Sequence, residues 1–396
     1  MSCCKSRNNE LPAAEYDSRR FDRLRQTAAL RENAFMQWRA GRVGVAGCGV
    51  LGSRLVPELV RSGIGHCTTF DYDLVSEENL GTQCFTLSGL YKTDALREQC
   101  NLICDGIVES RPIDIRHAGI GELAGLDAIV DCTDDPNLQW TLTEISNGLG
   151  IPMLRIAVDG SGERELGRVQ VSHGGKGYAC RLCSKSLEQL IPALPRTPCP
   201  RARPGSLPPS IVGSGIAMNV VGIALVQLQR LLGRKSDNQV FNSQIYVDLD
   251  NFQIIALTEH CSEKCISGHV TWDPITAETD SSGITFGELF DLAARLIGWA
   301  VDVIEPYNHA LCLAARCECG ETIEAIGTRW AMPPYCEKCH RLMFWELHTQ
   351  KPSWTYREAK NADILLRTLA ELGLPPAGAM ILARKQDKSL KRIVLK

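Results

Sequence analysis

The sequence predicts an α/β fold, with a Rossmann-like, mostly parallel sheet that carries helices on both faces and a smaller C-terminal domain. Two observations lead to this prediction. Short apolar segments alternate with helical stretches over residues 41–270, as in sheets built from strand–helix–strand units. The first of these segments, residues 43–46, runs directly into the pattern Gly47-x-Gly49-x-x-Gly52, which is typical of a nucleotide-binding turn.

The elements follow in order along the chain. Residues 1–40 form an N-terminal arm that we expect to be helical from about residue 15. The expected strands of the sheet are 43–46, 66–71, 128–131, 153–158 and 168–171. Residues 211–232 are the most apolar stretch, and polar residues interrupt it, so it predicts a buried core helix and not a membrane span. A hairpin of 244–249 and 252–257 follows, turning at residues 250–251.

The C-terminal part is predicted as a separate domain over residues 284–396. Residues 271–283, rich in Asp, Thr and Ser, are interpreted as a linker. Within the domain we expect a zinc ribbon, a helix near 362–372 and a closing strand near 379–383.

Composition indicates a large soluble enzyme. The 396 residues suggest two domains, and 44% hydrophobic residues are enough for sizeable cores. A net charge of −3 gives no indication that the protein binds nucleic acid. The first residues are polar and do not form a signal peptide, so we expect a cytoplasmic protein with no membrane partner.

The glycine turn has a mechanical explanation. One glycine permits the tight turn, one lets the backbone approach phosphates, and one lets the next helix pack closely on the strand. The amides at that helix N-terminus face the phosphates. Asp71 lies 19 positions after Gly52, at the tip of the second strand, where its carboxylate can accept hydrogen bonds from ribose hydroxyls.

A second set of residues favours ATP over a nicotinamide cofactor. Lysine neutralises phosphate charge, and a carboxylate holds Mg²⁺. The set comprises Asp71, Asp73, Asn79, Gln83, Lys92 and the segment Asp131-Cys-Thr-Asp134. In this order and spacing, residues 20–265 resemble the ThiF/MoeB/ubiquitin-activating enzyme family, whose pattern runs GxGxxG, DxDxVxxxNLxRQ, K, DCTD.

The resemblance implies roles for single residues. Gly47, Gly49, Gly52, Asp71 and Asp73 would belong to the ATP site, with Asp71 on the ribose. Asn79, Gln83 and Lys92 would contact the phosphates, and Asp134 would hold Mg²⁺. Arg23 is similar to the family arginine that reaches the partner subunit of a homodimer. The family arginine before Gln83 is Thr82 here, so that contact is missing or comes from Arg54 or Arg97.

Eighteen cysteines in an intracellular chain indicate metal or thiol chemistry. Cys180, Cys183, Cys261 and Cys265 could give four thiolates to a tetrahedral Zn²⁺, as in a site that the family often has. Cys317, Cys319, Cys336 and Cys339 have the spacing of a zinc ribbon, with sixteen residues between the pairs. Some of these pairs could instead be reduced thiols without a metal.

Cys199 stands in a proline-rich segment, which we interpret as a crossover loop over residues 184–210. Prolines keep the backbone extended and exposed, and neighbouring arginines favour the thiolate. The position matches the nucleophilic cysteine of relatives that carry a thioester. An idle thiol in a loop is the alternative. Cys84 and Cys132 are poorer candidates, since we expect both to be partly buried.

The resemblance implies an enzyme that adenylates the C-terminal glycine carboxylate of a ubiquitin-like protein with ATP. Cys199 would then form a thioester and pass the protein to a conjugating enzyme. The alternative is a sulfur-carrier protein adenylyltransferase of the thiamine or molybdopterin type, without an obligatory thioester. A nicotinamide-dependent oxidoreductase has only the glycine pattern in its favour. A non-catalytic scaffold gains some support from Thr82.

Overall fold

A computed structural model describes residues 20–27, 30, 33–159, 164–173, 175, 177–183, 212–233, 242–385 and 389–396. The chain divides into two compact units. The first comprises Met1–Ile113 and Leu126–Thr271, and the second comprises Asp114–Gly125 and Trp272–Lys396. An α/β sheet unit and a smaller C-terminal domain with a cysteine cluster confirm the predicted fold class.

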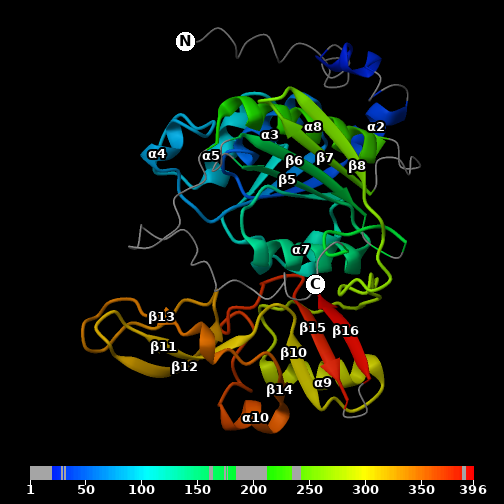
Figure 1. Ribbon diagram of the computed structural model, residues 1–396. Coiled ribbons are helices and arrows are strands. Elements are labelled where there is room, and N and C mark those ends of the chain that lie inside the picture. Colours follow the sequence, from blue (N-terminus) through cyan, green and yellow to red (C-terminus); the bar gives the residue numbers. More distant parts are fainter. Residues whose placement is uncertain are drawn as a thin grey trace, which may run out of the picture. The chain divides into compact units, whose positions relative to one another are not determined.

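The first unit is built on an eight-stranded sheet with the order β3-β2-β1-β4-β5-β6-β7-β8 (Figure 1). The first five strands in this order are parallel, and β6, β7 and β8 continue the sheet antiparallel. The strands are β1 (Arg42–Ala46), β2 (His66–Phe70), β3 (Val108–Arg111), β4 (Ala128–Asp131), β5 (Met153–Asp159), β6 (Leu166–Ser172), β7 (Ser243–Asp248) and β8 (Gln253–Thr258). The strand order reverses between β1 and β4, which is where α/β sheets bind ligands.

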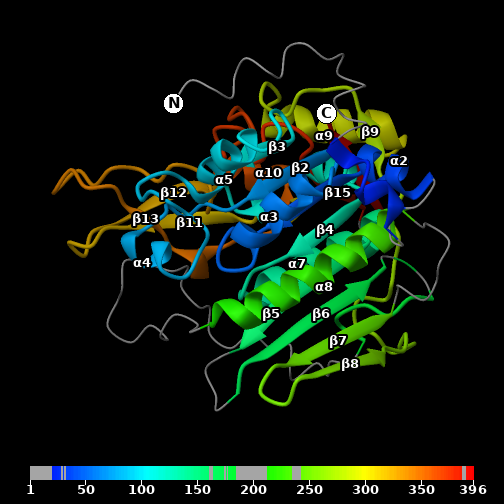
Figure 2. The ribbon, with the colours of Figure 1, turned by 90° about the horizontal axis from the view of Figure 1, so that it is seen from above.

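Helices cover both faces of this sheet. They are η1 (Leu24–Gln26), α2 (Asn33–Ala40), α3 (Gly52–Arg61), α4 (Glu77–Leu80), α5 (Lys92–Asn101), α7 (Pro136–Leu149) and α8 (Ser214–Gly233). Figure 1 shows α3 and α8 on one face and α7 on the other. From above, α8 lies along β5 and β6 (Figure 2). The side chains of these strands alternate between the two faces of the sheet.

The long helix α8 belongs to the core of the first unit. Its residues Ile216, Val220 and Leu228 are fully buried. By length and composition it is the one helix of the described ranges that could cross a membrane, and 56% of that apolar window is buried inside the protein. This agrees with the predicted core helix.

The second unit has a five-stranded sheet, β14-β10-β15-β16-β9, and a three-stranded sheet, β12-β11-β13. Its elements are η2 (Ile115–His117), α6 (Ile120–Ala124), β9 (Ile275–Ala277), α9 (Phe286–Ile297), β10 (Val303–Pro306), β11 (Leu311–Arg316), β12 (Thr322–Thr328), β13 (Phe344–Trp345), η3 (Leu347–Thr349), β14 (Trp354–Thr355), α10 (Tyr356–Asn361), β15 (Met380–Arg384) and β16 (Leu390–Leu395). Residues 114–125 join this unit, where the Gly121 amide donates to the Gly378 carbonyl at 3.2 Å.

Two expectations in the second unit are wrong. The segment 271–283 is not only a linker, because it contains β9, which pairs in parallel with β16. The helix expected at 362–372 is absent there. Helix α10 ends at Asn361, and Asp363 takes a left-handed φ of 56° that no helix continues through. The buried leucines of 362–372 lie in turns, and the Leu369 amide donates to the Ile284 carbonyl.

Gly167 tests how closely α8 lies on the sheet. A Cβ there would overlap a methyl group of Val220, so Gly167→Ala should lower the free energy of unfolding by about 1–3 kcal/mol through overpacking. Gly222→Ala, on α8 itself, is the control, because nothing lies within 4 Å of the Cβ position at Gly222. Urea unfolding measures both, and equal stabilities of the two variants would contradict this packing.

Candidate nucleotide site and cysteine clusters

The glycine turn lies between β1 and α3. Gly47 has φ of 87°, and a Cβ there would lie 2.8 Å from Cγ2 of Thr133. A Cβ on Gly52 would overlap the carbonyl oxygen of Gly47. At Gly49 the space is open, with nothing within 4 Å. Packing therefore explains the first and third glycines, and the second leaves room for a ligand such as phosphate against the backbone.

Asp71 ties this turn to the end of β2. Its Oδ2 accepts a hydrogen bond from the Cys48 amide at 2.7 Å, and its Oδ1 accepts one from the Asp73 amide at 2.9 Å. Burial raises the pKa of Asp71, and the nearby Lys92 opposes that rise. The carboxylate lies beside the glycine turn, where the sequence predicted a ribose ligand.

Lys92 begins α5 and is buried, with 7% of its surface exposed. Its Nζ lies 2.8 Å from Oδ2 of Asp73. Burial lowers the pKa of Lys92, whereas Asp71, Asp73 and the Cys48 thiol raise it, and the net shift is upward. Three of the predicted residues, Asp71, Asp73 and Lys92, thus form one charged group next to the glycine turn.

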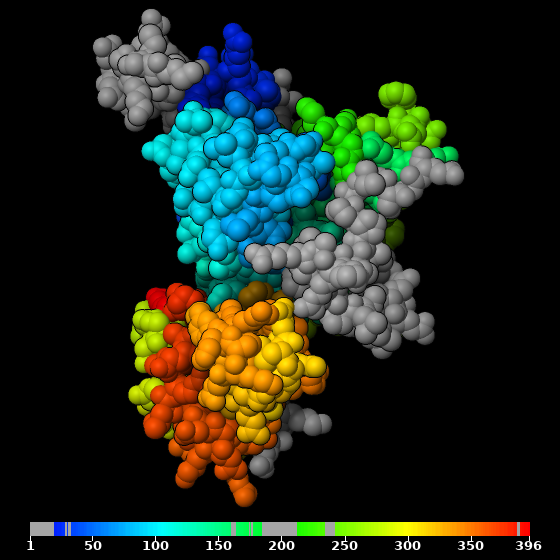
Figure 3. All heavy atoms as spheres, turned by 90° about the vertical axis from the view of Figure 1, so that its left-hand side faces the viewer, coloured from blue at the N-terminus to red at the C-terminus, as the bar shows by residue number. Residues whose placement is uncertain are grey.

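The loop around α4 lies on the surface of the first unit, on the side that faces the viewer in Figure 3. Asn79 caps α4, where its Oδ1 accepts from the Ser76 amide at 3.1 Å. The Gln83 Oε1 is buried without a partner among the described residues.

Arg54 lies beside the position where the family arginine is replaced. Its Nη1 donates to the carbonyl oxygen of Thr82 at 3.0 Å and to that of Val50 at 2.7 Å. Arg97 is instead paired with Asp94, 3.0 Å away on the same helix. Of the two candidates named for the missing contact, Arg54 is the one in contact with Thr82.

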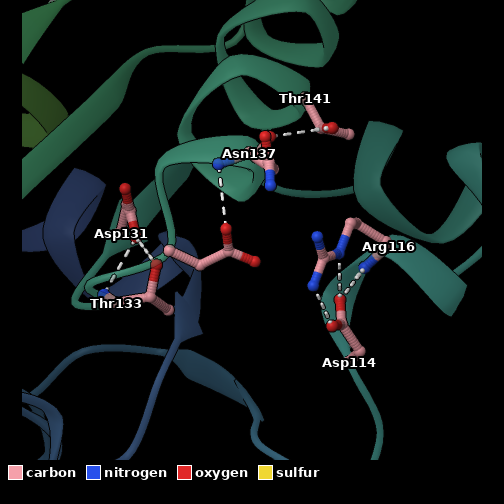
Figure 4. A network of polar contacts seen from close by, with 7 residues as sticks. Asp114, Arg116, Asp131, Thr133, Asn137 and Thr141 are labelled. Carbon is pink, nitrogen blue, oxygen red and sulfur yellow. Dashed lines mark hydrogen bonds and ion pairs between the residues drawn. The ribbon is translucent and has the colours of Figure 1, made fainter. Parts of the chain in front are cut away.

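Asp134 is exposed on the loop between β4 and α7. Figure 4 shows how that loop is fixed. Oδ1 of the buried Asp131 accepts from the amide and the hydroxyl of Thr133, at 2.9 and 2.7 Å. The Asp135 carboxylate caps α7 by accepting from the Asn137 amide at 2.8 Å. Asp134 stands between Thr133 and Asp135, so its backbone is held on both sides. The Asp114–Arg116 pair in the same picture belongs to the second unit.

The remaining predicted residues lie apart from this group or outside the described ranges. Arg23 is exposed at the start of η1. Cys199 and the crossover loop lie outside the described residues. Cys84 is exposed, contrary to the expectation of partial burial. Cys132 is partly buried, and burial raises the pKa of its thiol well above the usual value, which disfavours the thiolate.

The first cysteine cluster differs from the prediction in one ligand. Cys180, Cys183, Cys265 and His269 lie with their ligand atoms within 4.8 Å of one another. The Cys180 and Cys265 sulfurs are 3.6 Å apart, and His269 Nε2 is 3.2 Å from the Cys183 sulfur. Tetrahedral Zn²⁺ with thiolates at about 2.3 Å needs sulfurs about 3.8 Å apart, so this donor set fits zinc.

Cys261 was predicted as the fourth ligand, but it is exposed, with its sulfur 3.8 Å from His269 Nε2. His269 is 7% exposed and has a left-handed φ of 49°, so a strained backbone presents its ring to the sulfurs. The sequence signal for His269 is the spacing Cys265-x-x-x-His269. It was overlooked because the two cysteine pairs already supplied four ligands.

The second cluster brings together the four cysteines that the sequence predicted. Cys317 and Cys319 lie in the turn between β11 and β12, and Cys336 and Cys339 lie in a second turn before β13. The Cys317 and Cys339 sulfurs are 3.3 Å apart, and the Cys319 and Cys336 sulfurs are 3.6 Å apart. Four sulfurs from two turns are the donor set of a structural zinc ribbon.

The ThiF family model matches residues 21–265. The chain is 28% identical over 227 residues to adenylyltransferase and sulfurtransferase UBA4 of Eremothecium gossypii, covering 55% of this chain and 48% of that relative. It is 27% identical over 146 residues to the ATP-dependent ubiquitin transferase-like protein Cap2 of Pseudomonas aeruginosa, covering 35% of this chain and 26% of that relative. The chain thus spans half or less of the length of these relatives.

Among solved structures, E. coli MccB with ATP has a TM-score of 0.51 and 19% identity, covering 66% of this chain and 75% of that one. MccB with N-formylated MccA also has a TM-score of 0.51, with 17% identity over 65% of this chain and 77% of that one. These likenesses concern the fold.

Substitutions at Gly49 and Gly52 test two different roles, namely space for a ligand and close packing of the backbone. Gly49→Ala should fold normally, because its Cβ position is open, but it should weaken ATP binding at least about tenfold by blocking the backbone approach. Gly52→Ala should instead lower stability, because its Cβ overlaps the backbone of Gly47. Calorimetric ATP titration and thermal unfolding measure the two effects. Unchanged ATP affinity in the Gly49→Ala variant would place the phosphates elsewhere.

Metal analysis tests the two clusters. We expect about two Zn²⁺ per chain, from two tetrahedral ligand sets. His269→Ala should lose one ion and destabilise the first unit, whereas Cys261→Ser should keep both. Cys319→Ser should lose the other ion. The reverse result for His269 and Cys261 would restore the four-cysteine set that the sequence predicted.

Proposed function

The chain belongs to the ThiF family, and on that premise we propose that it adenylates the C-terminal carboxylate of a ubiquitin-like or sulfur-carrier protein with ATP. The observation that carries the proposal is the grouping of Asp71, Asp73 and Lys92 beside an open glycine turn, with the Asp134 loop against the same turn. A nicotinamide-dependent enzyme has no use for the lysine and the second carboxylate.

The reaction proposed is an in-line displacement at the α-phosphorus of ATP. A carboxylate oxygen forms a bond to phosphorus, the bond from the α-phosphorus to the bridging oxygen breaks, and pyrophosphate leaves with that oxygen. The products are an acyl adenylate and pyrophosphate. Since negative charge shifts to the leaving group, alignment and charge neutralisation matter more than a general base.

Each residue has a part in this step. The amides of the glycine turn bind phosphate oxygens, and Asp71 holds the ribose end of the nucleotide. Lys92 and the amides of Asn79 and Gln83 bind the phosphates, and Arg54 supplies the guanidinium that Thr82 lacks. Asp134 would hold Mg²⁺, which neutralises charge on the pyrophosphate group when bound.

The finer proposal is a ubiquitin-like modifier activating enzyme. In it, the Cys199 thiolate attacks the acyl carbon, AMP leaves, and the resulting thioester passes the protein to a conjugating enzyme. Arg23 would reach the phosphates of the partner subunit in a homodimer. A relative named as ATP-dependent ubiquitin transferase-like protein supports this direction.

The second candidate is activation of a sulfur carrier. It is supported by the relative named adenylyltransferase and sulfurtransferase, which matches 55% of this chain. The two candidates share the adenylate and differ in whether Cys199 forms an obligatory thioester.

Asp134→Ala tests the first step. Exchange of labelled pyrophosphate into ATP should require the carrier protein and Mg²⁺, and this variant should lower it at least about a hundredfold by removing the metal ligand. Asp105→Ala, which removes an exposed carboxylate before β3, is the matched control and should exchange normally. Normal exchange by the Asp134 variant would remove that residue from the proposal.

Cys199→Ala tests the second step. With ATP and the carrier protein, the wild type should form an adduct that reducing agent cleaves, and this variant should form none while it still exchanges pyrophosphate. Cys84→Ala should form the adduct normally. An adduct on the Cys199→Ala variant would mean that another cysteine is the nucleophile. Adenylation by the wild type without any adduct would favour the sulfur-carrier candidate.

A further inference from the structure

Residues 114–125 join β3 to β4 of the first unit but belong to the compact second unit. The chain therefore crosses between the units after residues 113, 125 and 271. Two glycines fit this segment closely onto the second unit. A Cβ on Gly119 would overlap the carbonyl oxygen of Ala377, and the Gly121 amide donates to the Gly378 carbonyl. Without this docking, one chain crossing would remain.

His117 of the segment packs into an aromatic cluster of the second unit. Its ring stacks on Trp330, with ring centres 5.5 Å apart and planes inclined by 28°, and its centre lies 5.7 Å from that of His309. His309 is 6% exposed. Nδ1 of His117, Nε2 of His309 and Nε1 of Trp330 are buried without a hydrogen-bond partner among the described residues. The cluster is therefore poorly suited to any additional charge.

The hydrogen bond of His309 fixes where a second proton would bind. Its Nδ1 lies 2.6 Å from the carbonyl oxygen of Tyr307, which can only accept, so Nδ1 carries the proton of the neutral ring. A second proton would bind Nε2 and create a buried cation whose N–H has no acceptor among the described residues. Burial lowers the pKa of His309 to about 4, the Tyr307 carbonyl opposes that shift, and His117 adds to it.

The charges around the two histidines do not compensate a cation. Asp114 is the one carboxylate of the described residues whose charge acts on this pair, and it opposes the fall that burial causes in the pKa of His117. Arg116 already neutralises Asp114, because its Nε and Nη2 donate to the two carboxylate oxygens at 2.9 and 2.6 Å (Figure 4). The Arg329 guanidinium, 4.4 Å from the centre of the tryptophan ring, adds positive charge. Burial raises the pKa of the Cys312 thiol near Arg329, so that thiol is neutral.

We propose that His117 and His309 form a pH-sensitive clamp, which holds residues 114–125 on the second unit while both rings are neutral and releases them in mild acid. In the released segment an imidazole in water takes up a proton at its ordinary pKa of about 6.5. Protonation therefore favours release. Docking is at full strength above about pH 6.5 and weakens as the pH falls toward the lower pKa values of the docked rings.

Hydrogen exchange at the Gly121 amide measures the release, because its acceptor belongs to the second unit. In the full-length protein, the protection factor of this amide, corrected for the intrinsic effect of pH on exchange, should fall about tenfold between pH 7.5 and 5.5. That is the fall expected for one histidine that regains its ordinary pKa. The Leu395 amide, which donates to the Ala379 carbonyl, is the internal reference and should keep its protection.

Two substitutions remove the titrating groups. His117→Phe keeps an aromatic ring in the stack, and His309→Asn keeps a side-chain N–H that can donate to the Tyr307 carbonyl. The double variant should protect the segment equally at both pH values. His348→Asn removes a histidine of the same unit whose side chain is 77% exposed, and this control should respond like the wild type.

Constant protection of Gly121 in the wild type, or a tenfold fall that persists in the double variant, would overturn the clamp. A parallel loss of protection at Leu395 would also overturn it, because acid would then unfold the whole second unit. The wild-type comparison of these two amides tests the clamp even where a variant does not fold.

Discussion

The buried ammonium group of Lys92 is the charge on which the nucleotide site depends. A lysine this deeply buried needs carboxylates close by, because burial alone would remove its proton. Asp73 provides a contact at 2.8 Å, and Asp71 adds its charge while it holds the Cys48 amide of the glycine turn. One charge balance therefore fixes the start of α5, the end of β2 and the turn after β1 relative to one another.

Local signals account for what the sequence predicted. The glycine turn, the strand β4 with bounds 128–131, and the hairpin of β7 and β8 all follow from residues close together in the chain. The missed features depend on partners far away. Strand β9 forms only because β16 pairs with it, and the segment 114–125 joins the second unit through Gly378, some 250 residues later. No pattern within these segments indicates such partners.

The same distinction holds for the sites. The Cys317 cluster was predicted in full because its ligands come from two tight turns. His269 was missed because Cys261, closer in sequence to Cys265 and paired with it, completed the expected set of four cysteines. Arg155 gives no motif at all. Its burial beside Asp131, with Nε 3.6 Å from Oδ2, is revealed only by the three-dimensional structure.

In the proposed reaction, the carboxylate of the carrier protein attacks the α-phosphorus of ATP. The most direct measurement uses a carrier protein that ends in glycine, with its terminal carboxylate labelled with ¹⁸O, and mass spectrometry of the nucleotide after the adenylate has been hydrolysed at its acyl carbon. Direct attack predicts pyrophosphate and AMP, with one ¹⁸O atom transferred from the carboxylate to AMP. Formation of ADP and phosphate, or AMP without the label, would contradict the account.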